Sequence, residues 1–142
     1  SIVFTHEKDD ETVKITEDGG LVVNGTPVRL TGGQRELVEE YYATFDGIID
    51  EAKQIGLEGA RIGVKGAKLG LSAVVGALLL IADDRDAEDL EIDLERKGEK
   101  IERMAERLEK RAKKLEARAE RLEDLHDDLR NEIDEIDELG WF

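Results

Sequence analysis

Hydrophobic residues recur every seven positions over two long stretches of the chain, at about residues 32–82 and 87–139. In the second stretch the repeat has no interruption: Leu94, Ile101, Leu108, Leu115, Leu122, Leu129 and Ile136. In the first stretch one such stripe is aliphatic and begins with a tyrosine: Tyr41, Ile48, Ile55, Ile62 and Leu69. A seven-residue repeat places apolar side chains along one seam of an α-helix. The pattern therefore predicts two long helices that pack as a coiled coil.

The first thirty residues follow a different pattern, in which apolar and polar positions alternate. Alternation of this kind predicts short strands, at residues 12–16, 21–23 and 28–30, with residues 1–5 as a further strand. Asn24-Gly25 is a strong signal for a two-residue hairpin turn. We predict a small β meander over residues 1–30, which must pack on a neighbouring element because an isolated hairpin is marginal in water.

Polar residues mark where the predicted helices begin and end. Thr31 and Gln34 form a capping box, so the first helix occupies residues 31–82 with its cap. The acidic segment 83–86 is the predicted turn, and Asp86 suits the N-cap of the helix that follows. The second helix then spans residues 87–139, and Gly140 opens an aromatic C-terminal tail, residues 140–142.

Glycines interrupt the first helix at steps of three and four, at Gly56, Gly59, Gly63, Gly66 and Gly70. Each glycine in a helix interior costs about 1 kcal/mol relative to alanine, so close packing must compensate for the stripe. If the chain folds back at residue 84, Leu108 faces Gly59 and Ile101 faces Gly66. The predicted close-packing residues are therefore these five glycines and the small residues of the second helix, Gly98, Ala105 and Ala112.

We thus predict a mainly α fold: a long antiparallel two-helix coiled-coil hairpin with a small N-terminal β meander. Each helix would have about fifty residues and a length of about 75 Å. Because both helices share one heptad phase, a single continuous helix of about 160 Å, whose glycines pack on another chain, remains an alternative. The hairpin would return Trp141 and Phe142 to the meander, which we expect them to cover.

A further apolar stripe lies well over a quarter turn from the glycines: Leu57, Val64, Leu71, Val75 and Leu78. A two-helix hairpin cannot bury both faces, and exposed apolar surface of this kind marks an interface. We expect self-association into a four-helix arrangement, so the expected partner is a second copy of the chain, as a homo-oligomer. Two alternatives are a chaperone-like or adaptor role, with a protein client on this stripe, and insertion of the hairpin tip into a membrane surface.

Charge narrows the classes of partner. The net charge is −15, from 36 acidic and 21 basic residues, which argues against nucleic acid because duplex binding needs an excess of cations. Along the second helix an acidic block at residues 83–95 is followed by a basic block at 96–122 and an acidic one at 123–138. Two hairpins paired in a stagger would bring acidic ends against basic middles. We therefore expect association that weakens as salt rises.

Composition excludes several other arrangements. The 40% charged and 4% aromatic content is typical of long helices and too poor in aromatics for a large globular core. The longest uncharged run, residues 69–82, has fourteen residues, whereas a spanning helix needs about twenty. No cysteine is present, so disulfides and thiolate metal sites are excluded. No signal peptide is recognisable at Ser1, so we expect a chain that is either cytoplasmic or already trimmed.

Motifs that carry catalytic chemistry are missing from the sequence. There is no P-loop, no dinucleotide fingerprint after a strand, no HExxH and no nucleophile elbow. His126 falls opposite Tyr42 in the predicted register, and we interpret it as a core histidine. His6, with Glu7, Asp9 and Asp10, is interpreted as part of a solvated loop. We predict no catalytic, cofactor-binding or metal-binding residue, and a protein that is not an enzyme.

One stretch of the chain resembles a known family. The residues that carry the resemblance are Ile15-Thr16-Glu17-Asp18-Gly19-Gly20-Leu21-Val22-Val23-Asn24-Gly25, Gln34-Arg35-Glu36, Tyr41-Tyr42 and Asp50-Glu51-Ala52. This pattern, over about residues 13–70, is similar to the YggN-type family of uncharacterised Gram-negative envelope proteins. The resemblance implies a periplasmic protein whose signal peptide has been removed. It implies no activity, so no catalytic or binding residue carries over.

Overall fold

The computed structural model describes the backbone of residues 1–82 and 87–142, and the side chains of residues 1–63, 65–66 and 91–142. The predicted turn at residues 83–86 lies outside this part. The chain is mainly helical, with an N-terminal antiparallel sheet and two long helices. It divides into two compact units, which are described separately: Ser1–Glu51 with Leu115–Phe142 (unit 1), and Ala52–Lys114 (unit 2).

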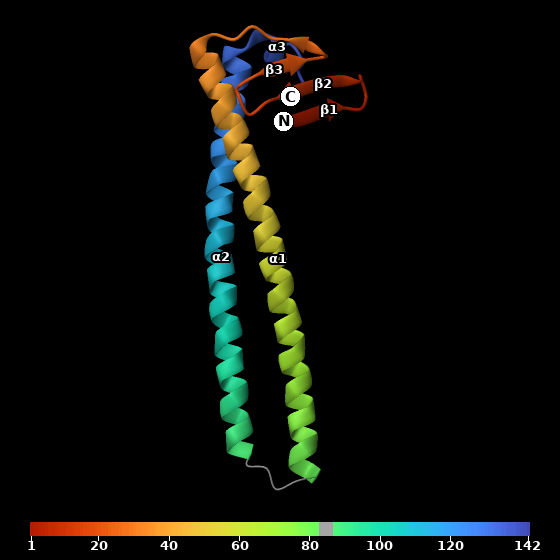
Figure 1. The fold of residues 1–142 in the computed structure, drawn as a ribbon, viewed down its shortest axis with the longest axis vertical. Helices are drawn as coiled ribbons and strands as arrows, with labels where there is room; N and C mark the ends of the chain where they lie inside the picture. The colour runs from red at the N-terminus through yellow and green to blue at the C-terminus, as the bar shows by residue number, and fades with distance from the viewer. Residues whose placement is uncertain (83–86) are drawn as a thin grey trace. The chain divides into compact units, whose positions relative to one another are not determined.

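The long helices are α1, Gly32–Ala82, and α2, Ala87–Glu132 (Figure 1). The predicted bounds of α1 are confirmed, whereas the prediction that the second helix continues to residue 139 is wrong. Helix α2 ends at Glu132 because Ile133 is extended, with φ −121° and ψ 105°. A one-turn helix, α3, follows at Asp134–Asp137. This bend allows the chain to bury both Ile133 and Ile136, which are 1% and 0% exposed.

The sheet has four antiparallel strands in chain order: β1 Ile2–His6, β2 Glu11–Ile15, β3 Leu21–Val23 and β4 Thr26–Pro27. The first three match the predicted strands within two residues. The predicted strand at 28–30 is wrong, because the ladder pairs Val23 with Thr26 and ends where Val22 pairs with Pro27. Beyond this pair one further backbone hydrogen bond continues, from the Val28 N–H to the Leu21 carbonyl oxygen at 2.9 Å. Both turn residues, Asn24 and Gly25, have positive φ, as a type I′ hairpin requires.

The start of α1 is the predicted capping box. The Thr31 backbone N–H donates to Gln34 Oε1 at 2.9 Å, and the Gln34 N–H donates to Thr31 Oγ1 at 3.3 Å. Gln34 Nε2 also donates to the Glu132 carbonyl oxygen, at 2.7 Å. One side chain therefore caps the start of α1 and binds the end of α2, within unit 1.

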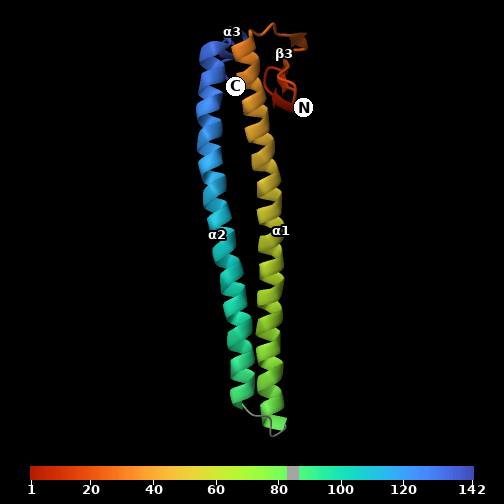
Figure 2. The ribbon, with the colours of Figure 1, turned by 60° about the vertical axis from the view of Figure 1, so that its left-hand side comes forward.

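Unit 1 has a closed hydrophobic core. Two views show the sheet beside the N-terminal part of α1 (Figures 1 and 2). The alternation along β2 turns Val13 and Ile15 inward, both fully buried, and leaves Lys14 exposed. The other buried apolar residues come from β3, from the helices and the segment that joins α2 to α3, and from the tail: Leu21, Val38, Tyr41, Leu125, Leu129, Ile133, Ile136 and Phe142. Phe142 is 6% exposed and packs edge-on against Phe4 at 5.0 Å, so the tail covers the sheet as predicted.

Unit 2 consists of the middle of the chain, with one segment each from α1 and α2. Contacts between the segments join Glu58 with Arg111, Gly59 with Leu108 and Lys65 with Met104, so within this unit the two run antiparallel. Among the described side chains of unit 2, none is buried. The two units therefore differ in kind: one has a sealed core and the other has a shallow seam.

Candidate functional site

Of the predicted glycine stripe, Gly59 is the described position that lies in contact with a side chain of α2. A Cβ added to Gly59 would lie 3.7 Å from Leu108 Cδ2, an ordinary van der Waals contact. A Cβ added to Gly56, Gly63 or Gly66 would meet nothing within 4 Å, and the same is true of Gly98 on α2. The structure therefore does not support close packing at these four glycines, and the side-chain surroundings of Gly70 lie outside the described residues.

The seam of unit 2 lies beside the predicted one. On α1 the half-buried positions are Ile55 and Ile62, with Glu58 and Gly59 between them. Gly56 and Gly63 each follow one of these isoleucines and so point about 100° away around the helix. The aliphatic stripe faces α2 because burying isoleucine removes more apolar surface from water than burying glycine.

On α2 the seam contains the predicted leucine and isoleucine stripe, of which Leu94, Ile101 and Leu108 are half-buried. The second predicted stripe is displaced by one residue. Met104 and Arg111 are half-buried, whereas the predicted Ala105 and Ala112 are exposed. The prediction for these two alanines is wrong, because the longer side chains at the preceding positions reach across to α1.

One side of the unit 2 seam is polar and basic. Arg111 pairs with Glu58 and also donates from Nη2 to Gln54 Oε1 at 2.8 Å. Beside this pair lies an open groove of about 330 Å³. Its lining has one acidic and four basic side chains together with two apolar ones: Glu58, Arg61, Ile62, Lys65, Met104, Arg107 and Arg111. The groove therefore has an excess of positive charge in a chain whose net charge is −15.

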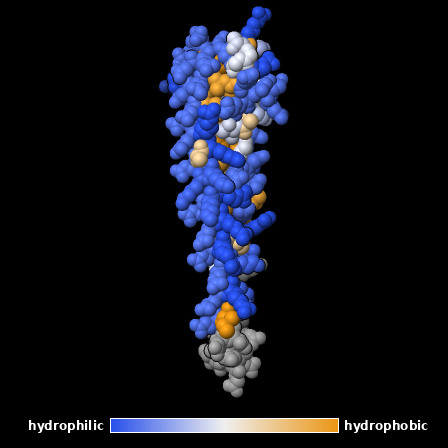
Figure 3. All heavy atoms as spheres, turned by 90° about the vertical axis from the view of Figure 1, so that its left-hand side faces the viewer, coloured by the Kyte–Doolittle hydropathy of each residue, from blue (hydrophilic) through white to orange (hydrophobic). Residues whose placement is uncertain are grey.

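Of the predicted interaction stripe, Leu57 is the member whose side chain is described. It is 63% exposed, and the side chains of Val64, Leu71, Val75 and Leu78 lie outside the described residues. On α2, Ile92 is 42% exposed. The face seen in Figure 3 is largely hydrophilic, with a few small apolar areas between the charged side chains. Leu57 is the most exposed large apolar side chain among the described residues.

In unit 1 the predicted partner of His126 is wrong by one residue. Its Nδ1 lies 3.2 Å from the hydroxyl of Tyr41, and its ring packs on Phe142 at 4.6 Å. Tyr42 instead lies 3.5 Å from the Ser1 amino group through its hydroxyl. Burial raises the pKa of Tyr41 to about 12. His126 is therefore a core histidine, as interpreted, that satisfies a buried tyrosine hydroxyl.

A second polar cluster was not predicted from the sequence. His6 and Glu11 pair across the β1–β2 hairpin, and Asp9 lies in its turn. Their potential ligand atoms, one from each residue, all lie within 4.8 Å of one another. Trp141 stacks on the His6 ring at 5.1 Å and donates its indole N–H to Glu11. In the sequence, His6 and Glu11 are separated by four residues. That they face each other across a turn follows only from the strand register.

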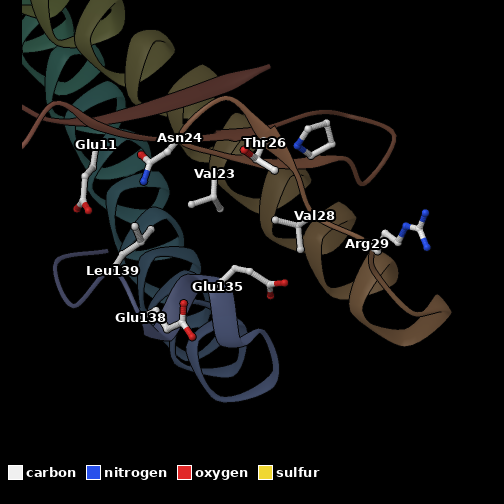
Figure 4. Close-up of a pocket in the computed structure, with 10 residues that line it drawn as sticks. Glu11, Val23, Asn24, Thr26, Val28, Arg29, Glu135, Glu138 and Leu139 are labelled. Atoms are coloured by element: carbon white, nitrogen blue, oxygen red, sulfur yellow. The ribbon is translucent and has the colours of Figure 1, made fainter.

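Unit 1 also has an open cavity of about 600 Å³ between the β3–β4 hairpin and α3. In Figure 4, Glu135 of α3 and Glu138, which follows α3, lie across this space from the hairpin, whereas the Arg29 guanidinium points away from it. Glu11 adds a third carboxylate, and Val23, Val28 and Leu139 supply apolar surface. The lining is therefore acidic and partly apolar.

Comparison of the chain with protein-family models, with curated proteins and with solved structures gives no match. Within the described part of the chain, neither long helix contains an apolar stretch that would be long enough to cross a membrane.

Proposed function

We propose that this is a non-enzymatic interaction protein that acts through helical self-association, as an antiparallel two-helix coiled-coil hairpin joined to a β meander. One observation carries the proposal: among the described side chains of unit 2, none is buried, although its seam includes isoleucines of α1 and leucines of α2. Most helical stability in proteins comes from the packing of apolar faces. A second pair of helices would complete the burial that one pair leaves unfinished, as in a four-helix bundle.

Exposed apolar side chains support contact on the outer face. Leu57 is 63% exposed and Ile92 is 42% exposed. Full burial of such a side chain contributes about 1.5–3 kcal/mol relative to leaving it in water. Leu57 begins the predicted stripe that continues at every seventh residue, so a second copy that covers it would cover the following members as well.

Charge supports a second copy as the occupant. The groove of unit 2 has Arg61, Lys65, Arg107 and Arg111 around a single carboxylate. The chain supplies its own counterpart, because residues 123–138 contain nine acidic residues and one arginine. We infer a staggered pairing in which the basic groove of one copy meets an acidic block of the other.

Sedimentation equilibrium over a range of protein and salt concentrations tests the proposal. The average mass is expected to rise from the single-chain 15.9 kDa to at least twice that value as protein concentration rises. Raising salt from about 0.01 M to about 1 M shortens the Debye length from about 30 Å to about 3 Å, which should weaken a staggered pairing. A constant mass of one chain over the whole range would refute self-association.

Two pairs of variants locate the contact. Leu57→Glu is expected to weaken association, whereas Ala117→Glu adds the same charge at an exposed position of α2 and should not. Arg61→Gln with Arg107→Gln removes two groove cations, and Arg96→Gln with Arg103→Gln removes two exposed cations outside the groove. Equal effects within either pair would refute the assigned surface.

The second candidate is a chaperone-like or adaptor role, which the open, partly apolar cavity of unit 1 favours. A single-chain mass together with binding of a hydrophobic dye would support it over self-association. Periplasmic localisation is proposed from the YggN-type resemblance alone. Fractionation of cells that express the native gene tests it, and recovery in the cytoplasmic fraction would refute it.

A further inference from the structure

We propose that His6, Asp9 and Glu11 form a binding site for a divalent transition-metal ion of the zinc type. The three residues belong to a single β-hairpin of unit 1, so the site does not depend on self-association. His6 and Glu11 are directly paired residues of the β1–β2 ladder, and Asp9 is in the turn that joins the strands. Side chains of a directly paired couple lie on the same face of a sheet, which brings an imidazole and a carboxylate together.

Distances in the cluster fit one ion. His6 Nδ1 and Asp9 Oδ2 are 3.2 Å apart. Zinc binds histidine nitrogen and carboxylate oxygen at about 2.0–2.2 Å, so two ligands at a tetrahedral angle lie about 3.3 Å apart. The ligand atoms of all three residues lie within 4.8 Å of one another.

The surroundings of His6 Nδ1 support a bound ion independently of the distances between the ligand atoms. This nitrogen is shielded from solvent and, among the described residues, has no hydrogen-bond partner in acceptable geometry, even though the Asp9 carboxylate is close to it. A buried polar atom without a partner is unfavourable, because it has lost its hydrogen bonds to water and gained none in exchange. An ion held between the nitrogen and the carboxylate would satisfy both atoms.

Trp141 holds two of the proposed ligands in place. It stacks on the His6 ring with an interplanar angle of 15° and donates its N–H to Glu11 Oε2. Contacts that orient metal ligands typically change metal affinity about 10–100-fold. Glu11 Oε1 remains available as a ligand, and the tail residue thereby fixes the direction of the carboxylate.

The donor set selects the class of ion. Two carboxylates and a neutral imidazole balance the charge of a divalent cation. An imidazole nitrogen favours zinc, copper, nickel and cobalt over calcium and magnesium, which prefer oxygen ligands. Three protein ligands leave a fourth position open, the arrangement found in zinc sites that bind a further ligand.

The sole tryptophan of the chain provides a direct readout. The test titrates untagged full-length protein with Ni²⁺ and records Trp141 fluorescence, because an open-shell ion close to an indole quenches its emission. Quenching that saturates at one ion per chain and is reversed by Zn²⁺ or by a chelator is the expected result. Isothermal titration with Zn²⁺, repeated with an excess of Mg²⁺, gives the affinity and the selectivity.

Asp9→Asn and Asp10→Asn are the matched pair of variants. Both remove one carboxylate from the same turn, and Asp10 has φ 54°, a conformation that asparagine also tolerates. Asp9→Asn is expected to weaken Zn²⁺ binding at least about 10-fold, since loss of a ligand costs no less than loss of an orienting contact. Asp10→Asn should leave the affinity within about twofold. Circular dichroism without metal confirms that each variant is folded.

Three results would overturn the proposal. They are equal Zn²⁺ affinities for the two variants, competition by excess Mg²⁺ as for a diffuse acidic surface, and unaltered Trp141 fluorescence at saturating Ni²⁺. His6→Gln gives a further check, because it retains a polar side chain and should abolish the quenching.

Discussion

Replacing two open glycines of α1 by alanine is expected to stabilise the protein. In Gly56→Ala and Gly63→Ala the new methyl group meets nothing within 4 Å. Each change removes about 1 kcal/mol of unfavourable helix propensity. The two sites are seven residues, or about 10.5 Å, apart along the helix and share no contacts. Their effects on the free energy of unfolding should therefore add, to an increase of about 2 kcal/mol. For a chain of this size that corresponds to a rise in Tm of about 6–8 °C.

Gly19→Ala is the matched control in unit 1, where the same chemical change has the opposite sign. Gly19 has φ +74°, and an added Cβ would lie 2.6 Å from Arg35 Cγ and 2.9 Å from the Arg35 carbonyl oxygen. The left-handed backbone costs a residue with a Cβ about 1–2 kcal/mol. The contact with helix backbone adds to this, so the total loss should be at least about 2 kcal/mol.

Far-UV circular dichroism during urea and thermal unfolding measures both effects. The measurements are made at low protein concentration, where the single chain dominates, and repeated at high concentration. A loss of stability in the Gly56→Ala, Gly63→Ala double variant would refute the reasoning, because it would mean that a neighbour covers this face in solution. A loss confined to high concentration would place the glycines in the contact between copies.

Two further predictions concern the core of unit 1. Phe142→Ala removes a side chain that is 6% exposed and packs on Phe4 and His126. We expect it to lower the free energy of unfolding, measured in urea, by about 3–5 kcal/mol. The control Glu138→Ala changes an exposed residue and should lower it by less than about 0.5 kcal/mol. The raised pKa of Tyr41, about 12 against 10.0 for the free side chain, means that the folded state favours the neutral phenol. Stability is therefore fully present below pH 10 and falls by roughly 2–3 kcal/mol as pH rises from 10 to 12. Unfolding free energies measured over that range should decline more steeply in the native protein than in Tyr41→Phe, and parallel declines would contradict this assignment.

Local signals predicted the elements of this fold well. The Thr31–Gln34 capping box located the start of α1, and Asn24-Gly25 located a hairpin, because each acts through hydrogen bonds or dihedral angles of neighbouring residues. The end of α2 was missed because the heptad continues through Ile136 without interruption. Nothing local breaks the helix at Ile133, and the bend is stabilised by burial in a core that the sequence pattern does not show.

Which face of each helix in unit 2 points toward the other helix was harder to predict than where the helices begin and end. Adjacent heptad stripes differ by about 100°, so Ile55 and Gly56 both fit a seven-residue repeat. Which of them faces α2 depends on the partner side chains, here Leu108 and Arg111. The His6 cluster was missed for a similar reason, since it exists only in the register that pairs His6 with Glu11.

The core of unit 1 joins the two extremes of the sequence, which has a consequence for biosynthesis. Val13 and Ile15 are buried together with Ile133, Ile136 and Phe142, more than one hundred residues later. The ribosome must therefore synthesise the chain as far as Phe142 before the core of unit 1 is complete. Until then the apolar face of the sheet can pack on α1 alone, and the part that the C-terminal residues cover stays in water. Contacts across so long a loop form slowly. Contacts between the helices of unit 2 join residues that are nearer in sequence, so we expect them to form first. We expect the meander to be the last part of the molecule to become protected from hydrogen exchange during refolding.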